Sequence, residues 1–408
     1  MKQKNKIFND PIYGFVHLSN AIDFEIIEHP YFQRLRRISQ LGLTYLVYPG
    51  AYHTRFHHAI GAYHLMQQAV KTLRTKGVYI SKEEGIAVCR AILLHDIGHG
   101  PFSHALEHSI VHQISHESIS KLLMDYFNRK FDGELDLTIE IFEGKYHRKF
   151  LHQLISGQLD MDRLDYLKRD SFYTGVSEGV INSDRILSML NVVNDELVVE
   201  SKAIYSIEKF IIARRLMYWQ VYLHKAVLSA EFMLEKVLER AKELAMQGTE
   251  VFATSSMSYF LKKEVNLSDF ESNPEVLDQF CHLDDYDVIS GIKEWIRHDD
   301  FILSDLSKRI LNRNLFKIRL QNDQIKPDFI AQLKKRVLTN YPISESDLKY
   351  FILEGKISNL AYNAEKENIL LLQKDGKLVD LLNTADQLNM SVLSQTVEKE
   401  YVCFPDYI

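Results

Sequence analysis

The segment from Leu93 to His104 constrains this chain most, because it places three histidines and one aspartate within twelve residues. Residues 86–94, just before it, are dense in apolar side chains and predict a buried helix. Two glycines and a proline soon after predict that this helix ends there. His95 and Asp96 should therefore lie at the inner end of the helix. A metal ion near a helix end can be reached by both, although neighbouring helical side chains point about 100° apart.

The chemistry of this pair indicates a divalent metal site. Histidine supplies a neutral nitrogen and aspartate a hard oxygen, a mixed set that suits Mn, Fe, Zn or Mg. An isolated His-Asp pair is more often a hydrogen bond on a protein surface. The apolar helix before this pair and the two further histidines after it favour the metal site instead.

Composition indicates an ordinary globular protein with a large core. The chain has 408 residues, of which 46% are hydrophobic and 25% charged, a length that suits one large domain with a smaller one. The net charge of -6 makes small anions more suitable partners than bulk nucleic acid, although a local basic pocket could still hold phosphates. Three scattered cysteines predict no disulfide framework and fit a reducing cytoplasm. Neither a signal peptide nor a membrane span is expected, because no apolar run of about 18 residues occurs.

Hydrophobic periodicity predicts a mainly α fold with a helical core over 1–250 and a smaller α+β region over 251–408. In the core we expect helices at 22–41, 58–75, 86–95, 115–127, 153–168 and 206–246, an extended segment at 44–49 and a strand at 192–199. Beyond residue 250 we expect strands at 316–320, 369–380 and 400–404, and helices at 328–338 and 345–354. Asp375-Gly376 is a hairpin turn signal. The C-terminal region is expected to serve oligomerisation or to form a lid.

Three short elements supply the candidate metal ligands: His58, the His95-Asp96 pair, and Asp162. Two histidines and two carboxylates leave coordination positions open for water and a substrate oxygen. Such a site suits a metal that must generate hydroxide and polarise a phosphoryl group. Taken singly, His58 is more typical of an ordinary core histidine and Asp162 of an ordinary helix cap. Their spacing in the sequence does not by itself indicate that they belong to one site.

These residues stand in an ordered pattern that resembles the HD-domain metal phosphohydrolases. More narrowly, the chain is similar to the deoxynucleoside triphosphate (dNTP) triphosphohydrolases, which include bacterial dGTPase-like enzymes and the animal SAM-and-HD-domain dNTPase. The resemblance covers about residues 6–230 and is carried by the motifs at 9–14, 32–42, 48–61, 95–104 and 162–170. It implies a mainly α fold, with a helical HD-domain core and a smaller α+β C-terminal portion. It also implies one divalent metal ion held by His58, His95, Asp96 and Asp162.

The resemblance assigns further residues to the substrate and to the reaction. Substrate-binding positions are Gln40, Leu41, Arg55, Arg163, Tyr166, Asp170, Arg214 and Tyr222. Among these the three arginines would hold the triphosphate, Gln40 and Leu41 would frame the sugar, and Tyr166 and Asp170 would read its 3′-hydroxyl. Tyr222 would stack near the 2′ carbon, where a ribose hydroxyl would clash.

Proton transfer is assigned to a group of histidines and one carboxylate: His99, His104, Glu107 and His116. Hydrolysis at the α-phosphorus requires a proton for the departing 5′-oxygen, and a histidine titrates near neutral pH. We assign this donation to His104, with Glu107 one helical turn away to orient it. Attack at the α-phosphorus releases intact triphosphate rather than single phosphates.

Two positions depart from the family pattern. Arg163 stands where relatives commonly have lysine. Arginine keeps the positive charge, but its planar guanidinium can bind a phosphate through two donors where the lysine ammonium acts as a point charge. Leu223 stands where the animal enzyme has glutamine, which leaves sugar selection and base contacts open. Partner recruitment of the animal type, through an N-terminal interaction domain, is not expected.

A candidate activator site is implied at Lys6, Glu28, Gln33 and Arg36, where relatives hold guanine at a subunit interface. The chain is accordingly expected to form a homo-oligomer, a dimer or tetramer, with a nucleotide activator. The alternative is that Gln33 and Arg36 simply face solvent on one helix.

Other functions remain open from the sequence. The same metal chemistry would serve a nucleotidase acting on monophosphates, a nuclease or a cyclic-nucleotide hydrolase. A regulator that binds nucleotide or single-stranded nucleic acid without turnover is a further alternative. It would need neither the four metal ligands nor His99 and His104. A purely structural helical domain leaves the polar cluster unexplained.

Overall fold

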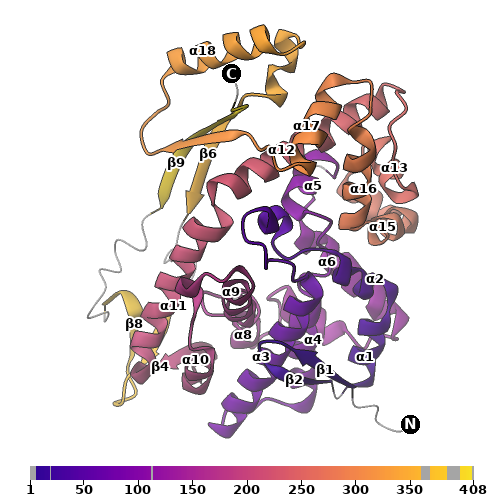
Figure 1. The fold of residues 1–408 in the computed structure, drawn as a ribbon. Helices are drawn as coiled ribbons and strands as arrows, with labels where there is room; N and C mark the ends of the chain where they lie inside the picture. Colours follow the sequence, from indigo (N-terminus) through magenta and orange to yellow (C-terminus); the bar gives the residue numbers. More distant parts are fainter. Residues whose placement is uncertain (1–5, 19, 112–113, 360–367, 384–395, 407–408) are drawn as a thin grey trace.

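The computed structural model describes residues 6–18, 20–111, 114–359, 368–383 and 396–406, without the side chains of His104, Glu107 and His108. Its architecture is mainly α, with small sheets in addition, which confirms the predicted fold class. Figure 1 shows a helical body, with α18 and the strands β6 and β9 at the end remote from the N-terminus.

The helical body contains α1 to α12 and two small β elements. Its helices are α1 (Ala21–Glu28), α2 (Pro30–Gln33), α3 (Arg55–Thr75), α4 (Lys82–Leu94), α5 (Ser103–Ser109), α6 (His116–Lys130), α7 (Asp136–Phe142), α8 (Lys149–Gln153), α9 (Met161–Thr174), α10 (Ser183–Met189), α11 (Ile204–Met217) and α12 (Lys225–Met246). Strands β1 (Lys6–Asp10) and β2 (Gly14–Leu18) pair antiparallel, as do β3 (Leu190–Val193) and β4 (Glu196–Glu200).

The site is carried by α3, α4 and α9, with α3 packed against both of the others. Helix α4 begins with a reciprocal cap, because Ser81 Oγ accepts from the Glu84 N–H and Glu84 accepts from the Ser81 N–H. It ends at Leu94. Asp160 caps α9 by accepting from the Arg163 N–H at 2.7 Å. The ends of these helices therefore meet with histidine and aspartate side chains at the junction.

The chain beyond α12 begins with further helices and ends in a sheet. The helices are α13 (Ser255–Leu261), α14 (Leu267–Ser272), α15 (Pro274–Cys281), α16 (Asp285–Trp295), α17 (Phe301–Leu311) and α18 (Pro327–Asn340). The strands are β5 (Lys317–Gln321), β6 (Leu353–Asn359), β7 (Leu370–Leu372), β8 (Leu378–Asp380) and β9 (Val397–Phe404). One sheet has the order β5-β9-β6, and β7 and β8 extend β3-β4 into a second sheet.

The region after residue 250 packs onto the body along α12. This helix contacts α5 of the body, and α17 and β5 of the region after residue 250. The division into 1–250 and 251–408 stays a prediction. No helix in the described part of the chain combines the length and apolar character that crossing a bilayer requires.

Several predicted elements are wrong in extent or type. The helix expected at 206–246 is interrupted by a π-helical turn, Tyr218–Tyr222, which separates α11 from α12. The segment expected to be extended at 44–49 lies instead largely in a 3₁₀ turn, Gly42–Leu46. The helix expected at 153–168 starts only at Met161. Long-range contacts override local propensity at each place. For example, Tyr48 Oη donates to the carbonyl of Gln220, which lies in the π-helical turn between α11 and α12.

Two further predictions need correction. The single strand expected at 192–199 is a hairpin, because Asn194 and Asp195 adopt left-handed backbone conformations (φ of 52° and 63°) that turn the chain. The helix expected at 345–354 is a 3₁₀ turn, Glu345–Tyr350, followed by β6. The hairpin turn at Asp375-Gly376 is confirmed between β7 and β8.

Candidate metal centre and active site

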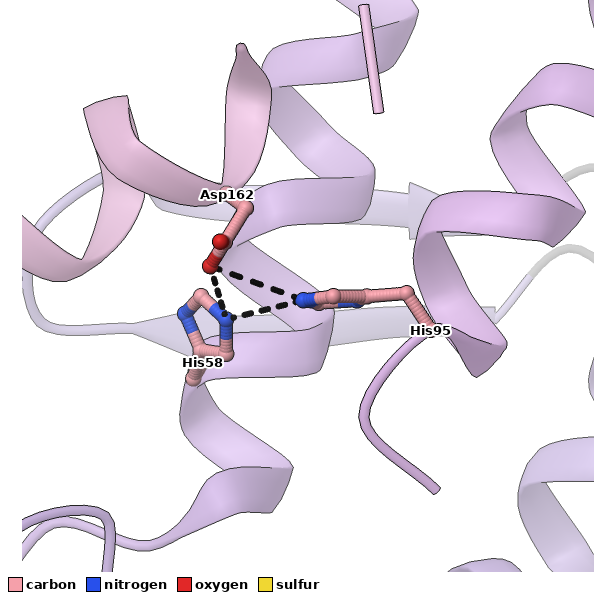
Figure 2. Close-up of side chains that lie close together, drawn as sticks. All are labelled: His58, His95 and Asp162. Atoms are coloured by element: carbon pink, nitrogen blue, oxygen red, sulfur yellow. Dashed lines mark hydrogen bonds and ion pairs between the residues drawn. The ribbon is translucent and has the colours of Figure 1, made fainter. Parts of the chain in front are cut away.

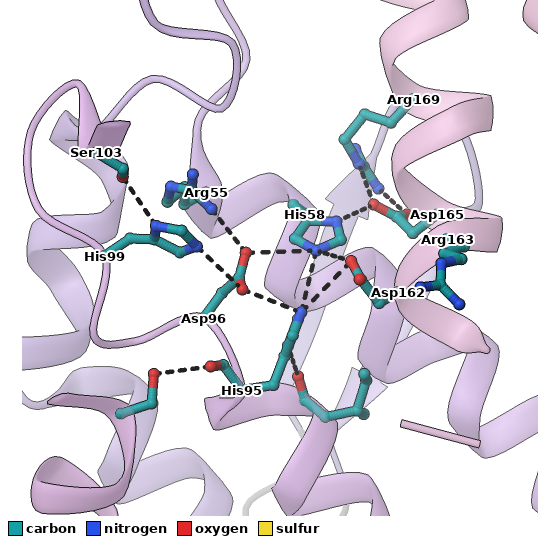
Figure 3. A network of polar contacts seen from close by, with 12 residues as sticks. Arg55, His58, His95, Asp96, His99, Ser103, Asp162, Arg163, Asp165 and Arg169 are labelled. Atoms are coloured by element: carbon teal, nitrogen blue, oxygen red, sulfur yellow. Dashed lines mark hydrogen bonds and ion pairs between the residues drawn. The ribbon is translucent and has the colours of Figure 1, made fainter. Parts of the chain in front are cut away.

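Three of the four predicted metal ligands, His58, His95 and Asp162, converge at one point between α3, α4 and α9 (Figure 2), and the fourth, Asp96, lies beside them (Figure 3). His58 Nε2 lies 3.4 Å from His95 Nε2 and 3.0 Å from an oxygen of Asp162. His95 Nε2 lies 3.5 Å from the same Asp162 oxygen and 3.3 Å from Asp96 Oδ1. Asp96 Oδ2 lies 3.8 Å from His58 Nε2. Side chains 104 residues apart in the chain thus present two nitrogens and two carboxylates to one centre.

Both histidines are oriented so that Nε2 faces this centre. The His58 Nδ1–H donates to Asp165 Oδ2 at 2.8 Å, and the His95 Nδ1–H donates to the Ile92 carbonyl at 2.7 Å. A hydrogen bond at Nδ1 fixes the tautomer in which Nε2 keeps its lone pair. Such an arrangement is typical of histidines that bind metals.

The spacing of these groups fits a divalent ion. Ligands that lie 2.0–2.2 Å from a metal are themselves roughly 3.0–3.5 Å apart. Burial lowers the pKa of His58, but hydrogen bonds to Asp162 and Asp165 outweigh burial and raise it to about 10. Burial raises the pKa of Asp162, whereas hydrogen bonds from His58 and His95 lower it well below its usual value. The carboxylates therefore favour positive charge at this centre, which a bound cation would supply.

A buried ion-pair network that sequence reasoning missed supports His58. Asp165 is fully buried and accepts two hydrogen bonds of 2.9 Å from Arg169, whose Nη1 donates to Asp10 at 2.9 Å. A Cβ atom at Gly61 would lie only 2.1 Å from both Asp165 and Arg169, so α3 needs glycine there. The available signal was spacing: Asp162 and Asp165 are three residues apart and therefore share one face of α9.

We expect Asp165→Asn to lower metal affinity and hydrolytic rate by about 10- to 100-fold, because outer partners of metal-binding histidines carry effects of that size. Metal titration followed by elemental analysis of the folded protein would measure the change. Asp184→Asn is the matched control, since Asp184 is exposed on α10. Unchanged affinity in a folded Asp165→Asn variant would mean that Asp165 serves packing alone.

Three arginines are predicted to hold a triphosphate, and two of them have a buried donor without a hydrogen-bond partner among the described residues, Arg55 Nε and Arg214 Nε. Arg163 Nη1 instead forms an ion pair with Asp160 Oδ2 at 3.2 Å. Arg55 Nη1 donates to Asp96 at 2.7 Å, so this arginine contacts one of the predicted metal ligands. Unpaired buried guanidinium donors are costly, and an anionic ligand would satisfy them.

Of the residues predicted to transfer protons, the structure describes His99 and His116. Their rings stack with centroids 3.7 Å apart, and His99 Nε2 lies 3.3 Å from Asp96 Oδ1. Burial, together with the charge of Arg55, holds the pKa of His99 well below its usual value, so this ring is neutral near pH 7. The side chains of His104 and Glu107 lie outside the described residues, although α5 carries both positions.

A cavity of about 300 Å³ is lined by Arg55, which hydrogen-bonds the predicted metal ligand Asp96, and we name it the nucleoside cavity. It is lined by four residues predicted to bind substrate, namely Gln40, Leu41, Arg55 and Tyr222. The remaining lining residues are Ser39, Gly42, Leu43, Thr44, Phe102, Ser103, Ala105, Tyr218, Leu223, Leu228, Glu231 and Leu234. The volume is at the lower end of the range for small-molecule sites. Another cavity, of about 780 Å³ between α1, α3 and α4, lies away from these groups.

Tyr222 and Asp170 form one hydrogen-bonded unit at the edge of this cavity. Tyr222 Oη donates to Asp170 Oδ2 at 2.7 Å, and His53 Nε2 lies 2.7 Å from Asp170 Oδ1. The rings of Tyr166 and Tyr222 lie edge to face, with centroids 6.2 Å apart. The sequence did not indicate His53, whose contact with Asp170 spans 117 residues.

Asp285 of α16 holds two walls of the nucleoside cavity. Its carboxylate accepts from the Ser39 N–H at 2.8 Å and from the Phe102 N–H at 3.3 Å. Phe102 needs such support, because it adopts a left-handed backbone conformation (φ of 47°) that non-glycine residues rarely adopt. Burial raises the pKa of Asp285 to about 6. The region after residue 250 therefore reaches the site directly.

The raised pKa of Asp285 predicts a pH-dependent stability. A carboxyl whose pKa is higher in the folded state stabilises the fold at pH below its unfolded pKa, and this stabilisation is lost as pH rises through about 6. Between pH 4 and 7 we expect the free energy of unfolding of the wild type to fall by about 2 kcal/mol more than that of Asp285→Asn. Urea unfolding at several pH values would measure both; parallel pH profiles would contradict the assignment.

The candidate activator residues lie near one another on the N-terminal side of the body. Lys6 forms an ion pair with Glu28, and Arg36 Nε donates to Gln33 Oε1 at 2.9 Å. The Arg36 guanidinium also lies over the Phe56 ring, 3.6 Å from its centre. Gln33 and Arg36 are thus held by neighbours within the chain, and their role at an interface stays a prediction.

Known proteins resemble this chain over most of its length. Residues 181–260 match the family model described as HD associated region. A phosphohydrolase from Bacteroides thetaiotaomicron is 49% identical and superimposes with a TM-score of 0.95, covering 98% of this chain and 100% of its own. An uncharacterized Bacillus subtilis protein, YwfO, is 32% identical over 93% of this chain and 87% of its own length.

Enzymes named for dNTP hydrolysis also match this chain, over 50% to 64% of their own length. The Dictyostelium discoideum homolog of the deoxynucleoside triphosphate triphosphohydrolase SAMHD1 is 32% identical over 59% of this chain and 50% of its own length. The human SAMHD1 is 25% identical over 89% of this chain and 64% of its own length. Together with the converged His and Asp ligands, these similarities place the chain in the HD-domain phosphohydrolase family, in the group that includes the dNTP triphosphohydrolases.

Proposed function

We propose that this protein hydrolyses deoxynucleoside triphosphates at the α-phosphorus and releases a deoxynucleoside and intact triphosphate. The observation that supports this most is the juxtaposition of three elements. The cluster of His58, His95 and Asp162, with Asp96 beside it, adjoins arginines of which Arg55 and Arg214 have unpaired buried donors among the described residues, and Arg55 also lines the nucleoside cavity. A phosphate ester with a nucleoside at one end matches all three.

Each group of residues at the site has its own proposed role in the reaction. When bound at the cluster, a divalent ion would lower the pKa of a water molecule and polarise a phosphoryl oxygen. Asp165 and the Ile92 carbonyl keep both imidazoles aimed at that position. Arg55, Arg163 and Arg214 would hold the negative charge of the triphosphate, and His104 would give a proton to the departing 5′-oxygen. The Mn, Fe, Zn and Mg ions all suit this mixed ligand set.

We further propose that the protein works as a homo-oligomer with a nucleotide activator, bound near Lys6, Glu28, Gln33 and Arg36. The similarity to SAMHD1 supports this proposal, and so does the proximity of these four side chains. Light scattering with and without dGTP tests it.

The test of the hydrolytic function is product analysis. Purified protein is incubated with each dNTP and with their mixture, with Mn²⁺ or Mg²⁺, and products are separated by ion-exchange chromatography. We expect deoxynucleoside and triphosphate in equal amounts, and no products after chelation with EDTA until metal is restored. If monophosphates or oligonucleotides are cut while dNTPs persist, the metal site stands and the proposed substrate is wrong. If nucleotides bind without turnover, the protein is a regulator.

A further inference from the structure

The nucleoside cavity contains a carboxylate that the proposed reaction does not use. Glu231 lies on α12 between Leu228 and Leu234, and all three line the cavity. Its Oε1 lies 3.8 Å from the Cβ position of Gly42, on the opposite wall. Residues on one face of α12 therefore present a single charged group into an otherwise largely apolar pocket.

This carboxylate has no partner of its own. Within the described residues no hydrogen bond or ion pair involves Glu231, and burial alone raises its pKa to about 7. Glu231 as a whole is half-buried, whereas Gln40 Oε1, on another wall of the same cavity, is buried without a partner among the described residues. A buried acceptor without a donor costs free energy, which a ligand with suitably placed N–H groups would recover. The polar groups on these walls therefore suit a ligand that donates hydrogen bonds.

We propose that Glu231 reads the nucleobase of the substrate and selects guanine. This rests on the proposed function. The N1–H and N2–H groups of guanine lie side by side on its Watson–Crick edge and match the two oxygens of one carboxylate. Adenine and cytosine offer an amino group next to a ring acceptor. Thymine offers one N–H between two carbonyl oxygens, which a carboxylate repels.

The walls of the cavity suit the rest of a purine. Leu41, Phe102 and Leu223 provide apolar surfaces for the faces of a planar base. Asp285 fixes the Phe102 wall through the backbone. At one end of the cavity, Tyr222 hydrogen-bonds Asp170 and Arg55 hydrogen-bonds Asp96. The sugar and the phosphates are assigned to this end. A nucleotide bound with its phosphates at the metal ligands thus has its base on the side of α12.

The test is a competition experiment. All four dNTPs are present at equal concentration in one reaction, and consumption of each is followed by chromatography. Ratios of consumption then report relative kcat/KM, and any nucleotide activation affects all four substrates equally. We expect wild-type protein to consume dGTP at least about 10-fold faster than dTTP, the discrimination that one bidentate base contact supplies.

Glu231→Gln should lower the dGTP to dTTP ratio about 10-fold, because the amide exchanges one acceptor for a donor that suits thymine carbonyls. Glu235→Gln, one turn further along α12 and outside the cavity, should leave the ratio unchanged. Hydrolysis with an unchanged ratio in Glu231→Gln overturns the inference. Wild-type protein that consumes dTTP as fast as dGTP overturns it without any variant. If no dNTP is consumed by the wild type, the proposed function itself fails and the inference with it.

Discussion

His95→Ala is expected to abolish hydrolysis, with a fall in kcat/KM well beyond the roughly 10- to 100-fold that loss of an outer hydrogen-bond partner costs. His95 supplies one of two nitrogens in the cluster, and its Nε2 lies within 3.5 Å of His58, Asp96 and Asp162. Without it three ligands remain, two of them carboxylates. Both the affinity for the metal and its alignment with the substrate should therefore be lost.

Activity and bound metal should be measured together for this variant. His282→Ala is the matched control, because His282 is exposed on the surface and its side chain lies against Asp278, away from the cluster. Circular dichroism would establish that both variants are folded. A His95→Ala protein that is folded and hydrolyses dNTPs at the rate of the control would exclude this cluster as the catalytic centre.

Arg169→Met is expected to lower the free energy of unfolding by about 3–5 kcal/mol, the usual result of removing one partner from a buried ion network. Arg169 is fully buried and binds Asp165 through two nitrogens and Asp10 through the third. Its removal leaves two buried carboxylates without their cation. The same network orients His58, so we expect activity to fall as well.

Urea unfolding followed by circular dichroism would measure this loss of stability. Arg185→Met is the matched control, since Arg185 is exposed and makes one side-chain hydrogen bond, to the Lys202 carbonyl. We expect the control to change stability by less than about 0.5 kcal/mol. Equal effects in the two variants would show that the buried network does not stabilise the fold.

The local sequence was sufficient for the mainly α fold and for the C-terminal end of α4, whereas its start lies four residues before the expected one. The apolar run, the glycines and the proline around His95 are short-range signals, and short-range signals determine where a helix begins and ends. The turn at Asp375-Gly376 was predictable for the same reason. The ordered motifs also indicated His58, His95, Asp96 and Asp162, and the structure brings these four side chains together, while their metal binding stays a prediction.

Other features required the tertiary structure. The interruption of the helix expected at 206–246 lets Tyr222 reach Asp170, and periodicity within the segment gave no sign of it. The contacts of Asp165 with His58 and of Asp285 with Ser39 join residues 107 and 246 positions apart. Local propensity reports only on near neighbours in the chain, whereas these contacts depend on how helices pack in space. The sequence by itself therefore determined the ligand types and the helices that carry them, and only packing decided which buried partners orient them and which walls enclose the substrate.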